Sequence, residues 1–245
     1  MKKLTRSALS AAVVAALSTG GVAMTSTATA EVSVNIGVVS NYLFRGVTQT
    51  FDSAAIQGGI DFEDASGFYA GTWASNIDFG DEAGYELDLY LGFAGEAANG
   101  IGYDVGYVYY AYPDSPDSID FGEIYGELSY DMFYGGIAYT INSDNDDDLF
   151  DTGDIYYYVG TDIPLPMDFS LGLVLGYYDF DADGSADIDG VDASYAHFAA
   201  GLAKDAGDLG EFSFNLEYAD IDEDDALGDA SSDDLKVWVG WNISF

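Results

Sequence analysis

A lone arginine and a set of regularly spaced carboxylates are the residues best suited to chemistry in this chain. Arg45 is the only arginine after residue 30, and by alternation along a strand it shares a face with Asn41. Six carboxylates occupy the polar face of other alternating segments: Glu86, Asp88, Asp104, Glu123, Glu127 and Glu217. A guanidinium among carboxylates is expected to form charge-assisted hydrogen bonds. We favour an ion pair that fixes the structure over a constriction residue that sets ion selectivity, and both interpretations stay open.

The single histidine is a weak candidate for catalysis. His197 follows Asp192 and Ser194, but all three are expected along one strand, where side chains do not converge as a triad requires. We therefore expect no enzyme activity, no catalytic residue and no cofactor. An outer-membrane lipid hydrolase is the less favoured alternative.

Three Asp-rich segments have some features of cation sites. Residues 179–184 place oxygen ligands at alternate positions with a glycine sixth, but the twelfth position is Gly190 rather than the Glu of a calcium loop. Residues 144–148 and 222–225 are similar clusters. We favour solvated loop charge, screened by salt, over specific metal sites. Weak binding of divalent cations at these loops, or a soluble calcium-binding secreted β-protein, are the alternatives.

The charge of the chain argues against one large class of partner. Residues 31–245 hold all 44 acidic residues but only three basic ones, Arg45, Lys204 and Lys236, so their formal charge is −41. Such a surface repels phosphate backbones, and we expect no nucleic-acid partner. The chain has no cysteine, which removes disulfides and thiolate metal sites. Because 49% of its residues are hydrophobic, the carboxylates must be segregated from the apolar side chains.

The first 30 residues have the pattern of a signal peptide. A basic start and an apolar run at residues 8–17 precede Ala28-Thr29-Ala30, which is a small-residue cleavage site. This run is too short to cross a bilayer as a helix, which needs about 20 residues. We expect residues 1–30 to direct export through the Sec pathway and to be cleaved, leaving residues 31–245 as one domain. A retained anchor is the less favoured alternative.

Period-two alternation is the dominant pattern after the leader. Every second residue from Leu235 to Phe245 is apolar, and the residues between them are mostly polar or small, as in a strand with one apolar face. The same reading along the chain predicts twelve strands, at residues 32–46, 53–62, 67–77, 84–95, 100–111, 121–131, 132–142, 153–162, 167–178, 190–203, 209–220 and 234–245.

The predicted connections alternate strictly between short turns and longer, Asp-rich links. Only the first link, residues 47–52, is of middling length. Short periplasmic turns and longer outer loops are typical of outer-membrane barrels, and an even strand number leaves both ends of the chain at the periplasmic rim. The sequence therefore predicts an all-β fold: a single transmembrane antiparallel β-barrel of about twelve strands. Phe245 then lies at the periplasmic rim, where the barrel-assembly machinery would meet the last strand.

Aromatic residues add an independent argument for a barrel in lipid, because aromatic girdles mark both membrane interfaces of such barrels. An outer girdle is predicted from Tyr42, Phe44, Tyr107, Tyr109, Tyr139, Tyr156, Tyr157, Tyr177 and Tyr218. An inner girdle is predicted from Tyr130, Phe133, Tyr134, Trp241 and Phe245.

Three segments near the N-terminus carry a family resemblance. They are Ser40-Asn41-Tyr42-Leu43-Phe44-Arg45-Gly46-Val47-Thr48-Gln49-Thr50, Gln57-Gly58-Gly59-Ile60-Asp61 and Gly67-Phe68-Tyr69-Ala70-Gly71-Thr72-Trp73-Ala74-Ser75-Asn76. With them the chain resembles the TorF-type family of hypothetical outer-membrane porins, a conserved hypothetical proteobacterial family. The resemblance is strongest over residues 31–110 and implies an outer-membrane channel without naming its cargo.

These observations together predict a passive, narrow channel for small solutes or cations, located in the outer membrane and surrounded by its lipid. The inward carboxylates predict a lumen that prefers cations. A non-conducting structural or adhesive barrel is the main alternative, and conductance separates the two.

Overall fold

The computed structural model describes residues 30–80, 83–116, 118–144, 150–180, 194–221 and 234–245. The predicted signal peptide, apart from Ala30, lies outside these ranges, and so does most of each Asp-rich segment. Within them, no helix has the length and apolarity needed to cross a bilayer.

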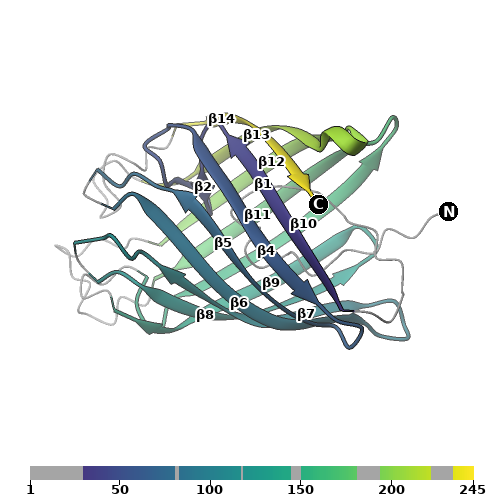
Figure 1. The fold of residues 1–245 in the computed structure, drawn as a ribbon, viewed down its shortest axis with the longest axis horizontal. Helices are drawn as coiled ribbons and strands as arrows, with labels where there is room; N and C mark the ends of the chain where they lie inside the picture. The colour runs from purple at the N-terminus through teal and green to yellow at the C-terminus, as the bar shows by residue number, and fades with distance from the viewer. Residues whose placement is uncertain (1–29, 81–82, 117, 145–149, 181–193, 222–233) are drawn as a thin grey trace.

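Twelve strands form one closed antiparallel barrel, as the alternation predicts (Figure 1). Neighbours along the barrel wall are neighbours in the chain, and the wall closes where β1 pairs with β14. The strands are β1 (Glu31–Val39), β4 (Ala55–Glu63), β5 (Phe68–Asn76), β6 (Tyr85–Glu96), β7 (Gly102–Ala111), β8 (Phe121–Tyr130), β9 (Phe133–Ser143), β10 (Ile155–Leu165), β11 (Phe169–Asp179), β12 (Tyr195–Asp205), β13 (Glu211–Ala219) and β14 (Lys236–Ser244).

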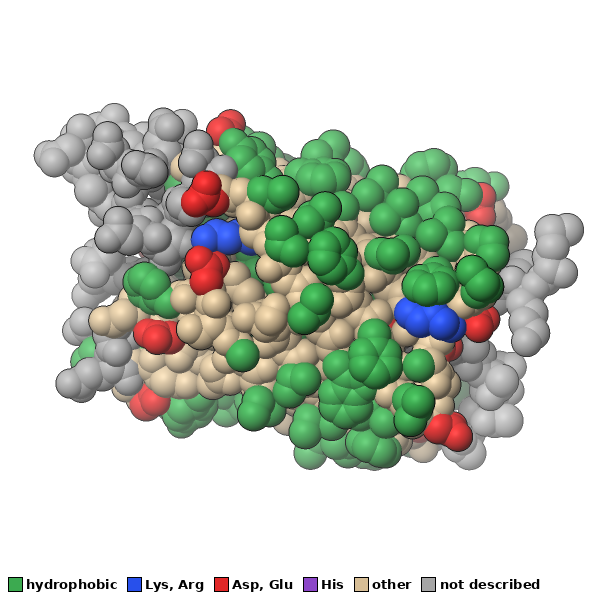
Figure 2. Space-filling view, turned by 90° about the horizontal axis from the view of Figure 1, so that it is seen from above, with side chains coloured by type: hydrophobic (Ala, Val, Ile, Leu, Met, Phe, Trp, Pro, Cys, Tyr) green, Lys and Arg blue, Asp and Glu red, His purple; other side chains and the backbone are tan. Residues whose placement is uncertain are grey.

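The strands alternate between an exposed apolar face and a buried, more polar one. On β10 and β11, Val159 pairs with Leu175, and each side chain is 59% exposed on the outside of the wall. Figure 2 shows hydrophobic side chains spread over this outer surface, with acidic side chains gathered toward the two ends. An exposed apolar surface of this extent is typical of a wall in contact with lipid.

Short turns and longer links alternate strictly between successive strands of the wall. The turns at 64–67, 97–101, 131–132, 166–168 and 206–210 are short, and the last of them holds the 3-10 helix η1 (Gly207–Leu209). Because the strands run antiparallel, all five lie at one end, which we call the short-turn rim; the longer links lie at the other, the long-link rim. The two rims are at the right and left of Figure 1.

The prediction for the first strand is wrong at its C-terminal end. β1 stops at Val39, and the chain then folds into the barrel as a small hairpin of β2 (Leu43–Phe44) and β3 (Val47–Thr48). All ten residues from 41 to 50, the lumen hairpin, are buried. Arg45 has a φ of 51° and Gly46 a φ of 91°, which a strand cannot accommodate. The first link is therefore residues 40–54, not 47–52.

Part of the predicted outer girdle is also misplaced. Tyr42, Phe44 and Tyr156 are buried in the lumen, whereas Tyr157 and Tyr177 are about 40% exposed on the outer wall. Alternation continues through residues 41–45 whether the aromatic side chains face lipid or pack inside the barrel. Periodicity alone therefore could not detect the hairpin.

Candidate pore lining

The lumen hairpin is attached to the barrel wall by a two-pronged ion pair. Arg45 donates from Nη1 to Oε1 of Glu123 on β8 at 2.7 Å and from Nη2 to Oε2 at 2.6 Å. Both side chains are almost completely buried. The guanidinium also lies over the rings of Tyr156 and Tyr178, at 4.1 and 4.8 Å from their centroids. Parallel hydrogen bonds and ring stacking together fix this cation in one geometry.

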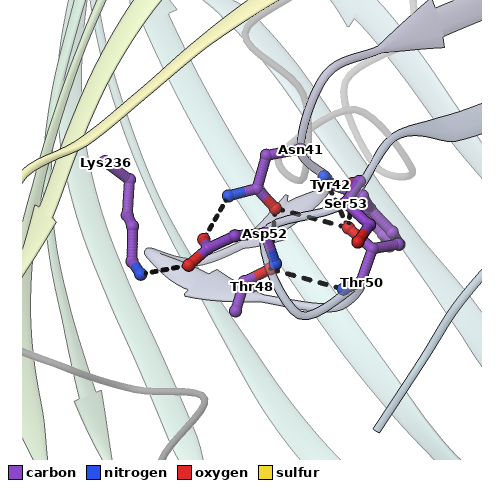
Figure 3. Close-up of polar contacts among 7 residues, drawn as sticks. All are labelled: Asn41, Tyr42, Thr48, Thr50, Asp52, Ser53 and Lys236. Atoms are coloured by element: carbon purple, nitrogen blue, oxygen red, sulfur yellow. Dashed lines mark hydrogen bonds and ion pairs between the residues drawn. The ribbon is translucent and has the colours of Figure 1, made fainter.

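Polar side chains within residues 41–52 hold the hairpin in shape (Figure 3). Asn41 Oδ1 accepts hydrogen bonds from the hydroxyls of Thr48 at 2.7 Å and Thr50 at 3.3 Å. The Asn41 amide donates to Asp52 Oδ1 at 2.7 Å. The Thr50 hydroxyl oxygen also accepts from the backbone N–H of Tyr42 at 3.2 Å. These hydrogen bonds within the hairpin replace part of the bonding that a strand of the wall would supply.

One lysine joins the hairpin base to the last strand. Lys236, the first residue of β14, lies 2.8 Å from Asp52 Oδ2, and Figure 3 shows the two side chains meeting. The Asp52 side chain is 53% exposed, so this pair sits at the long-link rim in contact with solvent. We call it the rim latch.

The hairpin also touches the wall on other strands. The Tyr42 hydroxyl donates to both carboxylate oxygens of Glu86 on β6, at 3.3 and 3.2 Å. The backbone N–H of Gly46 donates to the Glu217 carboxylate on β13. A Cβ at Gly46 would lie 2.9 Å from the Cβ of His197, so the turn fits the wall only because it is glycine.

Aromatic side chains fill the lumen near the long-link rim. Tyr110 stacks on Phe121 with ring centroids 4.5 Å apart, and Tyr178 stacks on Phe180 at 4.3 Å. Phe44 of the hairpin packs edge-on against Tyr110 at 5.6 Å. The hairpin and these rings narrow the lumen at this end.

The structure places all eight candidate residues inside the barrel, each at most 9% exposed. Asn41 and Arg45 reach the lumen from the hairpin rather than from β1, so their predicted position on a strand is wrong. The six carboxylates project inward from the wall. Glu86 and Glu217 lie near the long-link rim, Asp88 and Glu123 lie deeper, and Asp104 and Glu127 lie toward the short-turn rim.

A seventh inward carboxylate was missed by the sequence reasoning. Asp61 on β4 is 7% exposed; it accepts a hydrogen bond from the Asn35 amide at 3.2 Å and another from the Tyr90 hydroxyl. Its position follows the alternation of Gln57, Gly59 and Asp61 against Ile56 and Ile60, which offered the signal. We call Asp61 and the six predicted carboxylates the acidic ladder.

Comparison with known proteins places this barrel in a family. The model of the bacterial family Gcw_chp, described as proteins of unknown function, matches residues 23–243. The chain belongs to the Gcw_chp family. No curated protein matches this Gcw_chp chain.

Solved porins share the fold of this Gcw_chp barrel. The KdgM porin aligns with a TM-score of 0.56 at 8% identity, over 87% of this chain and 98% of that one. A KdgM complex with disordered oligogalacturonate gives 0.53 at 6% identity, over 89% and 98%. The NanC porin gives 0.54 at 12% identity, over 88% and 99%. At such identities the likeness establishes the barrel architecture alone.

His197 of this Gcw_chp chain contacts a tyrosine side chain. Its Nε2 lies 2.8 Å from the Tyr156 hydroxyl, and the rings stack with centroids 5.7 Å apart. The Ser194 hydroxyl instead accepts from the backbone N–H of Phe180 at 3.2 Å, and Asp192 lies outside the described residues. In the described ranges, no three His, Cys, Asp or Glu side chains form a group suited to a metal ion.

Proposed function

We propose that this protein is a narrow outer-membrane porin whose conductance is limited by the lumen hairpin. The observation that carries the proposal is a closed barrel with an apolar outer wall and an acidic interior into which one long link folds. Its fold is that of the KdgM and NanC porins. The resemblance of residues 40–76 to TorF-type porins supports the same assignment.

We further propose that the channel prefers cations. Seven buried carboxylates project from the wall strands, while Arg45 is the buried basic residue of the described chain and is paired with Glu123. Rings of carboxylates select cations because they lower the energy of positive charge in the pore. Oligogalacturonate, present in the KdgM complex, is an acidic sugar and would be repelled by this lumen.

Reversal potentials across planar bilayers in a salt gradient test this selectivity. Wild-type protein in a potassium chloride gradient is expected to give a reversal potential of the sign that indicates preference for potassium. Asp88→Asn, which neutralises one carboxylate of the acidic ladder, is expected to reduce this potential. Asp131→Asn removes a carboxylate from a short turn and is expected to leave the potential unchanged. Anion preference in the wild type would overturn the proposal.

Liposome swelling then narrows the solute. A series of potassium salts, neutral sugars and amino acids of increasing size is expected to show entry of small cations and exclusion of acidic sugars. Equal swelling rates for acidic and neutral sugars would contradict a role for the ladder in choosing solutes.

A non-conducting structural barrel is the second candidate, and the packed rings and hairpin near the long-link rim favour it. Deleting residues 41–50 discriminates between the two. A porin restricted by the hairpin is expected to gain conductance on deletion. If neither the wild type nor the deletion variant conducts above the empty bilayer, the structural role is the correct one.

We propose export through the Sec pathway and insertion by the barrel-assembly machinery acting on Phe245. The backbone N–H of Phe245 donates to the Val34 carbonyl at 2.8 Å, while its side chain is 75% exposed and available to a partner. Deleting Phe245 is expected to lower the amount of folded barrel in outer-membrane fractions. Normal amounts would exclude this residue as the recognition signal.

A further inference from the structure

The Arg45 guanidinium lies in a cage that the barrel wall builds around it. Glu123 of β8 accepts hydrogen bonds from both terminal nitrogens, at 2.7 and 2.6 Å. Tyr156 of β10 and Tyr178 of β11 place their ring centroids 4.1 and 4.8 Å from the guanidinium carbon. We call Glu123, Tyr156 and Tyr178 the guanidinium cage. A carboxylate that meets two parallel N–H groups, together with ring faces that stack on a planar cation, suits a guanidinium group.

Contacts between wall residues hold the cage in shape. The Tyr110 hydroxyl of β7 donates to Glu123 Oε2 at 3.3 Å. The Tyr156 hydroxyl lies 2.8 Å from Nε2 of His197 on β12, and the Tyr156 ring packs edge-on against Tyr178 with centroids 5.8 Å apart. Because none of these contacts involves the lumen hairpin, we expect the cage to keep its geometry when Arg45 leaves it.

The cation in the cage is supplied by a segment that is not part of the wall. β2 and β3 pair with each other in a separate two-stranded sheet. β1 pairs directly with β4, so the ladder of the wall is continuous without the hairpin between them. The hairpin can therefore move without breaking this ladder. Arg45 thus acts as a tethered ligand of a cage that the wall presents by itself.

Withdrawal of Arg45 would leave Glu123 as a buried carboxylate without its cation. A buried charge without a partner is strongly unfavourable, so the vacated cage needs a cation from solution. An ammonium group or a potassium ion supplies the charge, but it lacks the parallel N–H groups and the flat face that stacks on rings. A second guanidinium group supplies all three.

We propose that the guanidinium cage binds guanidinium-bearing solutes, and that Arg45 occupies it in their absence. Because Arg45 is tethered, it competes at a high effective concentration, and a free solute binds the wild type weakly. A solute that takes the cage keeps the hairpin away from β8. This consequence rests on the proposed function, in which the hairpin limits conductance: a guanidinium-bearing cation attracted by the acidic ladder would open the channel.

Calorimetric titration in detergent tests the site without a membrane. Methylguanidinium chloride is the probe, and methylammonium chloride is the matched control cation. Arg45→Ala and the variant that lacks residues 41–50 both vacate the cage. Each is expected to bind methylguanidinium at least tenfold more tightly than the wild type does, and at least tenfold more tightly than it binds methylammonium. Adding Glu123→Gln to either variant is expected to abolish this binding, whereas adding Asp131→Asn is expected to leave it unchanged.

Heat-modifiable migration in gels shows which variants form folded barrels. If Arg45→Ala does not fold, the variant without residues 41–50 supplies the measurement, because it removes the whole hairpin together with its cation. Equal affinity of the wild type and the vacated variants would assign the probe to the acidic links and overturn the inference. Equal affinity for the two cations would overturn it as well, because charge alone would then explain the binding.

Single-channel recordings separate this inference from the proposed function. Millimolar methylguanidinium is expected to lengthen the high-conductance periods of the wild type, and methylammonium is expected to leave them unchanged. Unchanged or shorter periods with methylguanidinium would overturn the opening role. If the vacated cage binds the probe but no protein conducts, the site stands and the channel fails. If the wild type prefers cations but Glu123→Gln does not affect probe binding, the channel stands and the site fails.

Discussion

At the scale of single residues, the buried ion pair between Arg45 and Glu123 defines the lumen. Removing two charges from water costs several kcal/mol, and only good geometry offsets that cost. Here the guanidinium makes two short hydrogen bonds and lies over aromatic rings. The pair therefore holds the hairpin against β8, while each partner depends on the other.

Arg45→Met is expected to lower the free energy of unfolding by about 3–5 kcal/mol, because it leaves Glu123 buried without its cation. The double variant Arg45→Met with Glu123→Met is expected to recover most of that loss, since neither charge remains. Urea titrations of the barrel in lipid vesicles measure both. A double variant as unstable as the single one would show that the stability comes from packing of the arginine stem instead.

The same residues show what the sequence could predict about the site. Alternation along each wall strand sufficed to find Glu86, Asp88 and Glu217, because a strand allows only two side-chain directions. The partner of Arg45 could not be chosen in this way. Residues 45 and 123 are brought together by barrel closure, and a single sequence does not contain that distance.

At the scale of elements, the lumen hairpin depends on one glycine. Gly46 has a φ of 91°, and its missing side chain lets the turn approach His197 and Ala219 on the wall. Gly207 in a short turn has a φ of 62° but no atom near the position of its absent Cβ. Both glycines thus need a positive φ, but only Gly46 also needs the space that a side chain would fill.

Gly46→Ala is expected to displace the hairpin from the lumen. Gly207→Ala is expected to lower the free energy of unfolding by only about 1 kcal/mol, because alanine disfavours a positive φ. Trypsin reports the difference, because Arg45 is a cleavage point inside the hairpin. Cleavage after Arg45 is expected to be at least tenfold faster in Gly46→Ala than in the wild type or in Gly207→Ala. Equal rates in all three proteins would show that the hairpin tolerates a methyl group there.

The rim latch is expected to affect hairpin motion more than stability. Asp52 is more than half exposed, so Asp52→Asn should cost at most about 1 kcal/mol. Single-channel recordings should show more frequent conductance steps in Asp52→Asn than in the wild type. Because salt screens exposed pairs, the two proteins should converge at 1 M salt. Identical single-channel recordings of the two proteins at low salt would show that the rim latch has no role in gating.

The positions of the strands show which features a period-two pattern can predict and which it cannot. Eleven of the twelve strands lie where alternation put them, because lipid outside and a polar lumen inside impose opposite faces on every strand. Residues 41–46 continue the same alternation in the sequence although they are not part of the wall. The chain instead leaves the wall after Val39 and turns back at Arg45 and Gly46, where φ is positive, and an alternating pattern does not encode this turn.

At the scale of the whole molecule, the barrel is apolar outside and acidic inside. Leu175 lies midway along β11 and is 59% exposed, whereas Leu209 is 68% exposed in the short turn that holds η1. The two leucines are similarly exposed, but only the first is placed where the hydrocarbon of a membrane would be.

Leu175→Arg is expected to lower the free energy of unfolding in vesicles by about 2–4 kcal/mol, and Leu209→Arg by about 1 kcal/mol or less. Unfolding by guanidinium in thin bilayers measures both variants against the wild type. Equal effects would mean that the outer wall does not face hydrocarbon.

The rim latch has a consequence for assembly, because its two residues lie on either side of the seam between β1 and β14. Asp52 follows the first strand, while Lys236 opens the last one, 184 positions later. Lys236 therefore belongs to the last strand to be synthesised, and the rim latch can form only when β14 has paired with β1 and closed the barrel. A barrel without its last strand keeps the contacts of the hairpin with Glu123, Glu86 and Glu217 but lacks the rim latch, so the latch marks a completed barrel.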